Sequence, residues 1–451
     1  MPETIGTITS IKLSSFLSGT VNAFDTCMIN LLEAGTGVSW VFLLWNSRDD
    51  APAVERVRET QRLALAREAA FRKFTVHLFA ELDSSIVDDI QVDIPTLGGP
   101  PIAMAWGWNE EGELGNGTTT DRSTPAPIQN LEEVKAIASG DSHVLALKAD
   151  GTVWAWGRGS SGQLGDGTAT QRNTPVQVAN LTGVTAIAGG SYHSLARTSD
   201  GAIWAWGDNQ AGELGDGTTT ERHEPVQVQN LSGVAAISAG FNYSLALKSD
   251  GTVWAWGFNF NGQLGDGTTT ARAMPLQVQN LTGVVAISAG SSHVLALADD
   301  GTIWAWGRNN VGQLGDGTMT EHHVPFHMQV LDRVTAVSAG DQHSLALRDD
   351  GPVWAWGLNE FGELGDGTSS QYNLTPAQAQ NLTEVTEISS GYFHSLALKD
   401  GVVWAWGDNT KGNLGDGTTT QRRAPVQAIN LSRVSAIAGG NWHSHCICDQ
   451  P

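Results

Sequence analysis

The chain has little that would suit a secreted or membrane-spanning protein. Its 451 residues include only three cysteines, Cys27, Cys446 and Cys448, which are too few for a disulfide framework and fit a reducing compartment. The first residues, MPETIGTITS, lack the basic and apolar regions of a secretory signal, and the longest apolar run, Val38–Trp45, is too short to cross a bilayer. We therefore expect a cytoplasmic protein without a membrane span; export by a signal-independent route stays open.

Positive charge is also scarce. The chain has 25 Lys and Arg against 47 Asp and Glu, which gives a formal net charge of −22. A surface this acidic repels phosphate backbones and anionic lipid, and affinity for nucleic acid comes mainly from neutralising phosphates. The composition therefore predicts a globular protein that binds neither nucleic acid nor acidic membranes.

Glycine and tryptophan are abundant instead, with 53 and 17 residues, and they follow a repeat. Each unit contains two short β-rich runs around Asp-Gly, as in SLALKSDGTVWAWG from Ser244 to Gly257. Asp-Gly between such runs predicts a two-residue hairpin turn with both residues at positive φ. Polar and apolar residues do not alternate cleanly in either run, which predicts strands buried on both faces. A turn-rich, then extended, second half brings the count to four strands, as in a propeller blade. The period is 50 residues, marked by Trp106, Trp156, Trp206, Trp256, Trp306, Trp356 and Trp406.

The two ends of the repeat region complement each other. Six units carry both hairpin strands on one stretch, whereas the seventh is split between Gly439–Cys448 and Ile102–Gly107. A closed ring pairs these two halves, and an open solenoid gains nothing from them. We therefore predict an all-β, seven-bladed β-propeller that closes by pairing its N- and C-terminal strands.

The residues before the repeats show no periodicity. Residues 1–94 read as a small α+β module, with β-rich runs and a helix that begins near Pro52. Residues 95–101, PTLGGPP, form a short linker, and residues 102–451 form the propeller. No motif in the first module indicates its role.

The repeated unit, G-x-x-H-S-L-A-L followed by D-G-x-V-W-A-W-G-x-N-x-x-G-Q-L-G-D-G, resembles the regulator-of-chromosome-condensation repeat family over roughly residues 102–448. The resemblance implies a seven-bladed propeller that serves as a protein-binding scaffold. The family includes a nucleotide-exchange factor for the Ran GTPase that also sits on nucleosomes, a plant ultraviolet photoreceptor, and bacterial β-lactamase inhibitors. The nucleosome-binding member uses basic surfaces, whereas this chain is strongly acidic. Asn441-Trp442-His443 lacks the Arg of the photoreceptor's Gly-Trp-Arg-His motif, so a light sensor is disfavoured.

Tryptophans at i and i+2 of each Trp-Ala-Trp share one face of a strand. We therefore expect fourteen of them, counting Trp106 and Trp108 of the first unit, to fill the wedges between blades.

Residues capable of catalysis or metal binding recur at fixed positions of the repeat. A histidine in the same slot of six units predicts a structural hydrogen bonder, because a catalytic base needs its own particular partner. The Asp of LGDGT predicts a turn former, since a calcium loop needs several converging oxygen ligands. We therefore expect no catalysis, no cofactor and no metal, with calcium at these aspartates left as an alternative. The histidines are His143, His193, His293, His343, His394 and His443, and the aspartates are Asp166, Asp216, Asp266, Asp316, Asp366 and Asp416.

One cluster of soft metal ligands lies at the end of the last repeat. Strand alternation sends His443 and His445 to one side and Cys446 and Cys448 to the other, whereas a tetrahedral zinc site needs ligands that converge. We expect buried thiols here, with a metal site as the alternative.

Positions that vary between units are candidates for a binding site, because residues that are the same in every unit serve the fold. Variation concentrates in the two residues of G-x-x-H and in the positions after W-G, which an antiparallel hairpin places at one end, opposite the Asp-Gly turns. Aromatic residues on loops anchor protein interfaces. The charged residues at these positions are Arg158, Arg308, Glu110, Glu111 and Asp341. The predicted binding residues are Trp108, Tyr192, Phe241, Phe258, Phe260, Phe361, Tyr392, Phe393 and Trp442, and Phe241, Phe258 and Phe260 are the strongest candidates because they share one unit.

Three classes of function follow. The first is a non-enzymatic scaffold that presents this aromatic face to a protein partner. The second is a structural subunit that self-associates through residues 1–94. The third, favoured least, is a carbohydrate-binding or enzymatic propeller. The sequence does not name the partner or the oligomeric state.

Overall fold

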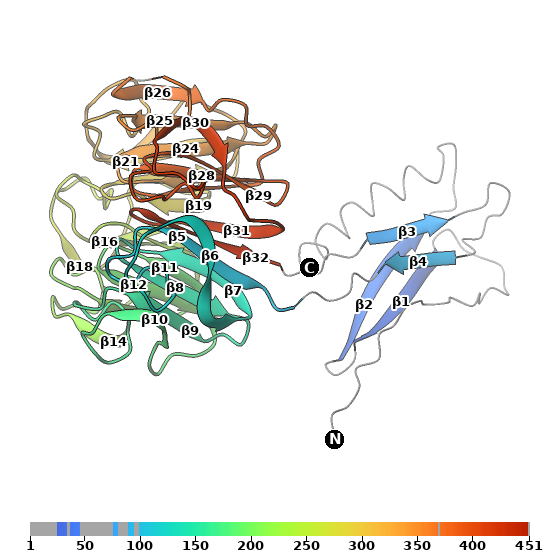
Figure 1. Ribbon diagram of the computed structural model, residues 1–451. Coiled ribbons are helices and arrows are strands. Elements are labelled where there is room, and N and C mark those ends of the chain that lie inside the picture. Colours follow the sequence, from blue (N-terminus) through green and yellow to red (C-terminus); the bar gives the residue numbers. More distant parts are fainter. Residues whose placement is uncertain are drawn as a thin grey trace. The chain divides into compact units, whose positions relative to one another are not determined.

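The computed structural model describes residues 25–33, 37–45, 75–79, 89–93, 99–368 and 370–449 (Figure 1). Contacts divide the chain into two compact units, residues 1–98 and 99–450. In the first unit, β1 (Asp25–Glu33) pairs antiparallel with β2 (Gly37–Trp45), and β3 (Thr75–Phe79) pairs antiparallel with β4 (Asp89–Asp93). The helix expected near Pro52 lies outside the described residues, and the domain boundaries and α+β class stay predictions.

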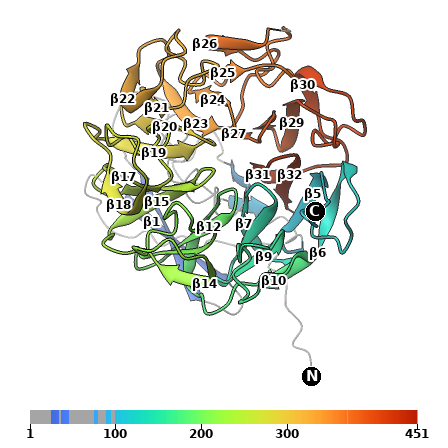
Figure 2. The ribbon, with the colours of Figure 1, turned by 90° about the vertical axis from the view of Figure 1, so that its left-hand side faces the viewer.

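Residues 102–448 form seven four-stranded antiparallel sheets arranged in a ring (Figure 2). The first strand of each sheet contacts its counterparts in the neighbouring sheets, so these strands form the inner wall. The first strands are β7 (Val134–Ser139), β11 (Val184–Gly189), β15 (Val234–Ala239), β19 (Val284–Ala289), β23 (Val334–Ala339), β27 (Glu387–Ser390) and β31 (Val434–Gly439). The second strands are β8 (His143–Lys148), β12 (His193–Thr198), β16 (Tyr243–Lys248), β20 (His293–Ala298), β24 (His343–Arg348), β28 (His394–Lys399) and β32 (His443–Cys448).

The outer half of each blade holds the Trp-Ala-Trp strand and an edge strand. The third strands are β5 (Ile102–Gly107), β9 (Val153–Gly157), β13 (Ile203–Gly207), β17 (Val253–Gly257), β21 (Ile303–Gly307), β25 (Val353–Leu358) and β29 (Val402–Gly407). The fourth strands are β6 (Arg122–Glu132), β10 (Arg172–Gln177), β14 (Arg222–Gln227), β18 (Arg272–Gln277), β22 (His322–Met328), β26 (Tyr372–Gln378) and β30 (Arg422–Gln427). No helix among the described residues is long and apolar enough to cross a membrane.

The predicted ring closure is confirmed. One sheet has the order β31–β32–β5–β6, so two strands from the end of the chain and two from the start of the repeats build one blade. β32 pairs antiparallel with β5, from His443 opposite Gly107 to Cys448 opposite Ile102. The propeller is therefore closed by the hydrogen bonds of one strand pair.

The hairpin turns differ from the sequence-based expectation in most blades. At Ala149-Asp150-Gly151 only the glycine has a positive φ, of 80°, and the Gly151 amide donates to the Lys148 carbonyl at 3.0 Å. The additional residue before Asp-Gly makes a three-residue loop, in which only the last position is left-handed. The predicted two-residue turn occurs at Asp400-Gly401, where that residue is missing and φ is 52° and 73°. Lys399 and Val402 pair directly across this turn.

The core consists of seven apolar clusters, each shared by two neighbouring blades. Trp256, for example, packs against Leu195, Leu214 and Val228 of the preceding blade, and its indole nitrogen donates to the Glu213 carbonyl at 2.8 Å. The second Trp of every Trp-Ala-Trp is 0% exposed, as is Trp106.

The expectation for the remaining tryptophans was only partly right. The first Trp of each Trp-Ala-Trp is half-buried at the margin of a cluster. Met104 takes this place in the first repeat, and Trp108 lies beyond the end of β5, at the surface formed by the loops. The half-buried set comprises Trp154, Trp204, Trp254, Trp304, Trp354 and Trp404.

Candidate functional site

The two variable sets of positions meet at one end of the propeller. In each blade the residue after Trp-Gly donates its amide to the residue before the histidine slot, as from Phe258 to the Asn242 carbonyl at 2.8 Å and from Trp108 to the Trp442 carbonyl at 2.8 Å. The antiparallel register places the Asp-Gly turns at the opposite end of the same hairpins. We call this end the loop face; it comprises residues 107–111, 140–143, 157–161, 190–193, 207–211, 240–243, 257–261, 290–293, 307–311, 340–343, 357–361, 391–394, 407–411 and 440–443.

Five of the predicted aromatic residues form one continuous group, which we call the aromatic cluster: Trp108, Phe361, Tyr392, Phe393 and Trp442. The ring centroids of Phe361 and Phe393 lie 5.3 Å apart, those of Phe393 and Trp442 6.1 Å, and those of Trp442 and Trp108 5.6 Å. Tyr392 contacts both Phe393 and Trp442. All five side chains are half-buried. The cluster depends on ring closure, because Trp108 belongs to the first repeat and Trp442 to the last.

The other four predicted residues form two pairs. Tyr192 contacts Phe241 with centroids 5.9 Å apart, and the Arg158 guanidinium lies 5.2 Å above the Tyr192 ring. Phe258 and Phe260 stack at 6.4 Å, and Phe260 is 72% exposed. Phe241 therefore does not join the Phe258–Phe260 stack of its own unit, because it lines the cavity at the centre of the ring and contacts Tyr192.

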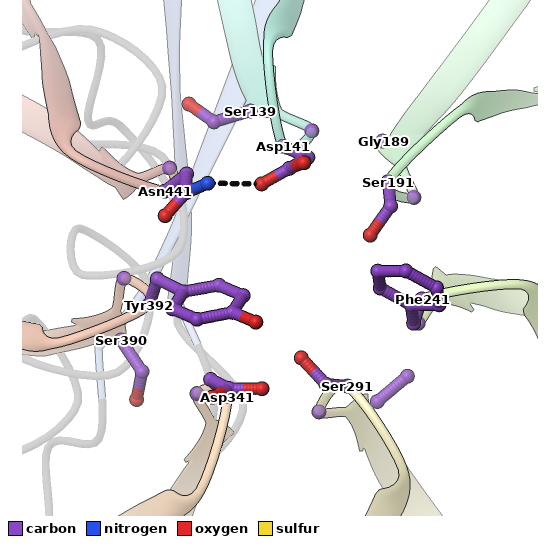
Figure 3. Close-up of a pocket in the computed structure, with 18 of the residues that line it drawn as sticks. Ser139, Asp141, Gly189, Ser191, Phe241, Ser291, Asp341, Ser390, Tyr392 and Asn441 are labelled. Atoms are coloured by element: carbon purple, nitrogen blue, oxygen red, sulfur yellow. Dashed lines mark hydrogen bonds between the residues drawn. The ribbon is translucent and has the colours of Figure 1, made fainter. Parts of the chain in front are cut away.

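A cavity of about 110 Å³ lies at the centre of the ring, and all seven blades line it (Figure 3). Each blade contributes three consecutive residues, the middle one being the glycine that precedes the histidine slot by three positions. A methyl group on Gly140 would lie 2.4 Å from the Gly190 carbonyl oxygen, so glycine is what allows neighbouring blades to approach here. The residues that follow the glycines are Asp141, Ser191, Phe241, Ser291, Asp341, Tyr392 and Asn441.

Two of these residues, Asp141 and Asp341, carry carboxyl groups, and burial disfavours their charged form. Burial raises the pKa of Asp141 to about 6, and it also raises the pKa of Asp341. Asp141 accepts a hydrogen bond from the Asn441 amide, and Asp341 accepts one from the Gln342 amide at 2.8 Å. Sequence reasoning selected Asp341 but missed Asp141; the available signal was that Asp141 occupies the same repeat slot as Phe241.

The repeated histidines link neighbouring blades. His143 Nε2 lies 2.8 Å from Ser194 Oγ, and this hydroxyl donates to the Gln163 carbonyl at 2.8 Å. Because the hydroxyl hydrogen is used on the carbonyl, His143 must donate from Nε2. Burial lowers the pKa of His143 to about 3, so the ring is neutral at ordinary pH and only a weak base. The same link recurs in the pairs His193–Ser244, His293–Ser344, His343–Ser395 and His394–Ser444.

The LGDGT aspartates are turn formers in the structure. Asp166 accepts hydrogen bonds from the amide and hydroxyl of Thr168 through one oxygen and from Arg172 through the other, with an Nη2 to Oδ2 distance of 2.7 Å. Both carboxylate oxygens are therefore engaged within the repeat, as they also are in the Asp216–Arg222 and Asp266–Arg272 pairs.

The Cys/His cluster alternates along β32 as predicted. Cys446 Sγ lies 3.6 Å from Cys448 Sγ on one face. The rings of His443 and His445 are 5.1 Å apart on the other, where His445 contacts Trp156. The described residues contain no group of three or more His, Cys, Asp or Glu side chains placed to hold a metal ion.

A closed ring of seven four-stranded antiparallel blades defines a seven-bladed β-propeller. Residues 230–450 match the RCC1-like domain, and residues 105–147, 150–197 and 200–247 match the regulator of chromosome condensation (RCC1) repeat. The propeller therefore belongs to the regulator of chromosome condensation repeat family.

The fold is shared with solved structures that are distant in sequence. Human WBSCR16 superposes with a TM-score of 0.71 at 23% identity, covering 78% of this chain and 99% of that one. Prp20p from Saccharomyces cerevisiae gives a TM-score of 0.71 at 23% identity, covering 78% of this chain and 92% of that one.

Sequence relatives match over shorter stretches. The ultraviolet-B receptor UVR8 of Arabidopsis thaliana is 47% identical over 51 residues, which are 11% of this chain and 12% of the receptor. The RCC2 homolog of Danio rerio is 33% identical over 101 residues, which are 20% of each protein. These matches extend over a fifth or less of either relative, so they relate the repeats rather than the whole proteins.

Proposed function

We propose that this protein is a non-enzymatic interaction scaffold whose propeller presents the aromatic-rich loop face to a protein partner. The observation that carries the proposal is the Phe258–Phe260 stack, in which Phe260 is 72% exposed at the same end as the aromatic cluster. A phenylalanine this exposed gains by being covered, and aromatic side chains supply much of the energy of protein interfaces.

The arrangement of the loop face supports a partner larger than a small molecule. The aromatic cluster, the Tyr192–Phe241 pair and the Phe258–Phe260 stack are spread over several blades, with a narrow central cavity among them. Small-molecule sites are concave pockets that enclose most of their ligand, whereas protein interfaces place aromatic anchors across a broad surface. Prp20p binds Gsp1p and histones, and these are partners of the same general class.

The chemistry of the described residues supports the non-enzymatic part of the proposal. The repeated histidines are neutral and engaged with serines, and the LGDGT carboxylates are engaged within their turns. The proposal that the protein does not bind nucleic acid is supported by the net charge of −22. Self-association through residues 1–94 is the alternative function, and it concerns a part of the chain that is mostly outside the described residues.

Replacing Phe258 and Phe260 together by serine is expected to weaken binding of the natural partner by at least about 30-fold, because hot-spot residues each contribute about 2 kcal/mol or more. The partner would be recovered by cross-linking and mass spectrometry with the full chain, and its affinity measured by calorimetry. The matched control is Val285→Ser with Val330→Ser, which removes apolar side chains that are 55% and 60% exposed near the Asp-Gly end. A partner that binds F258S/F260S as tightly as the unchanged chain would contradict the proposal.

Light scattering after size exclusion separates the two functions. A scaffold that awaits another protein is expected to elute as a single chain when pure. A large species from the pure full chain would favour the structural subunit. If F258S/F260S then kept the same large mass, the loop face would not be the assembling surface.

A further inference from the structure

The central cavity of the loop face has two acidic and two aromatic sides. Figure 3 shows Asp141 and Asp341 on opposite sides of the opening, with Tyr392 and Phe241 on the two sides between them. The lining contributed by the described residues contains no lysine or arginine. We call this site the channel mouth, defined by Asp141, Phe241, Asp341, Tyr392 and Asn441. Its two carboxylates attract a cation, and its aromatic faces add to that attraction.

The two carboxylates are separated from water to different degrees, since Asp341 is buried and Asp141 is half-buried. Asp341 is 6% exposed, and burial is the main reason why the pKa values of Asp141 and Asp341 are raised. Arg158 lowers the pKa of Asp141 and Arg308 lowers that of Asp341, but burial raises each pKa by more, so neither arginine fully offsets its carboxylate. A buried carboxylate without a full counter-charge gains more from an entering cation than a solvated one does.

A buried acceptor in the same wall also lacks a donor. Asn441 lines the cavity and is 8% exposed; its amide nitrogen donates to Asp141, and its amide oxygen has no partner among the described residues. Buried amide oxygens are nearly always hydrogen-bonded. The unpaired amide oxygen is independent of the acidic charge, and it indicates a ligand that carries N–H groups.

We propose that the channel mouth receives one lysine or arginine side chain from the protein partner. The inference rests on the proposed function and specifies the chemistry of that partner. A cavity of about 110 Å³ holds one extended side chain, and it excludes a helix or a folded loop. The cationic head lies between Asp141 and Asp341 and against the rings of Phe241 and Tyr392. The partner surface around it is expected to be basic, since this chain carries a net charge of −22.

The test uses the full chain and a probe small enough to enter the cavity. Saturation-transfer NMR would compare acetyl-lysine-N-methylamide with acetyl-norleucine-N-methylamide, which has the same apolar stem without the ammonium group. The lysine probe is expected to bind saturably with a Kd on the order of 1 mM, and the norleucine probe at least about tenfold more weakly.

Substitutions connect this binding to the channel mouth. Asp141→Asn with Asp341→Asn removes both charges at nearly unchanged shape and is expected to weaken the lysine probe at least about tenfold. The matched control is Asp150→Asn with Asp250→Asn, which removes the same charge from the opposite end of the blades and should leave binding unchanged. Thermal unfolding checks that each variant is folded. Phe241→Ser, which removes one aromatic side, provides a second variant and is expected to weaken binding about threefold or more.

Three outcomes would overturn the inference. They are the absence of saturable binding by the lysine probe, equal binding by the norleucine probe, and equal binding of lysine to D141N/D341N. None of them bears on the broader proposal, because the effect of F258S/F260S on the natural partner is measured separately. If that pair lost the partner while the lysine probe failed, the loop face would remain an interface without a cation site.

Discussion

Replacing Trp256 by alanine is expected to lower the free energy of unfolding by about 3–5 kcal/mol. Trp256 is fully buried between two blades, where it packs against Leu195, Leu214 and Val228. The change leaves a cavity in this wedge and also removes the donor to the Glu213 carbonyl, which lies 2.8 Å from the indole nitrogen. Equilibrium unfolding in urea, followed by far-ultraviolet circular dichroism, would measure the loss.

The neighbouring tryptophan provides the matched control. Trp254 lies two residues earlier on the same strand but is half-buried, and Lys248 lies 5.6 Å above its ring. Trp254→Ala is expected to cost about half as much or less, because much of this ring is already in contact with water. Equal losses for the two variants would contradict the division into inner and marginal tryptophans.

Replacing Glu113, Glu213 and Glu363 by glutamine is expected to stabilise the protein at pH 9 and to change little at pH 4. Burial raises the pKa of Glu213 and Glu363 from 4.5 to about 7, and that of Glu113 from 4.5 to about 8. One oxygen of each carboxyl group is buried without a hydrogen-bond partner. Gln163 and Gln263 occupy the same slot in other blades, so the fold accepts the amide.

Whether stability rises or falls with pH depends on the pKa values of these glutamates in the folded and unfolded states. The unfolded chain ionises near pH 4.5 and the folded chain near pH 7 to 8, so between these values the folded state holds the additional protons. The contribution of these three groups to stability is therefore most favourable below about pH 4.5, falls as the pH rises and levels off above about pH 8. Each group raised to about 7 contributes a loss on the order of 3 kcal/mol, at about 1.4 kcal/mol per pKa unit.

Unfolding curves of the triple variant between pH 4 and pH 9 would check this expectation. Glu110→Gln is the control, since Glu110 is an exposed acid on the loop face, and its effect should stay within about 0.5 kcal/mol. If the triple variant and the unchanged chain lost stability in parallel as the pH rose, these three glutamates would not be the cause.

Much of the propeller could be predicted because its determinants are local and repeated. The 50-residue period fixes the number of blades, and the split seventh unit predicts that β32 pairs with β5, as the structure confirms. Turn chemistry was predictable where the loop length was counted correctly, as at Asp400-Gly401. It was wrong at Asp150-Gly151, because one additional residue moves the left-handed position to the glycine alone.

The end of the ring that carries the variable positions could be predicted, but the arrangement of their side chains could not. Strand register sends both variable sets to one end, which the hydrogen bond between Phe258 and Asn242 bears out. Which aromatic residues touch depends on the distance between neighbouring blades and on closure of the ring. The contact between Trp108 and Trp442 therefore cannot be inferred from either repeat alone.

The sequence by itself determined the class of fold, its closure and the end of the ring where variation lies, because these follow from the repeat period, the split seventh unit and the antiparallel hairpin in each unit. Only the tertiary structure decided which tryptophans are fully buried, that Asp141 lies across the channel from Asp341, and that Glu213 is held without a counter-charge. These features arise where residues from separate repeats meet across the ring (Figure 3). Burial and electrostatic interaction depend on that packing in three dimensions, and no local pattern encodes it.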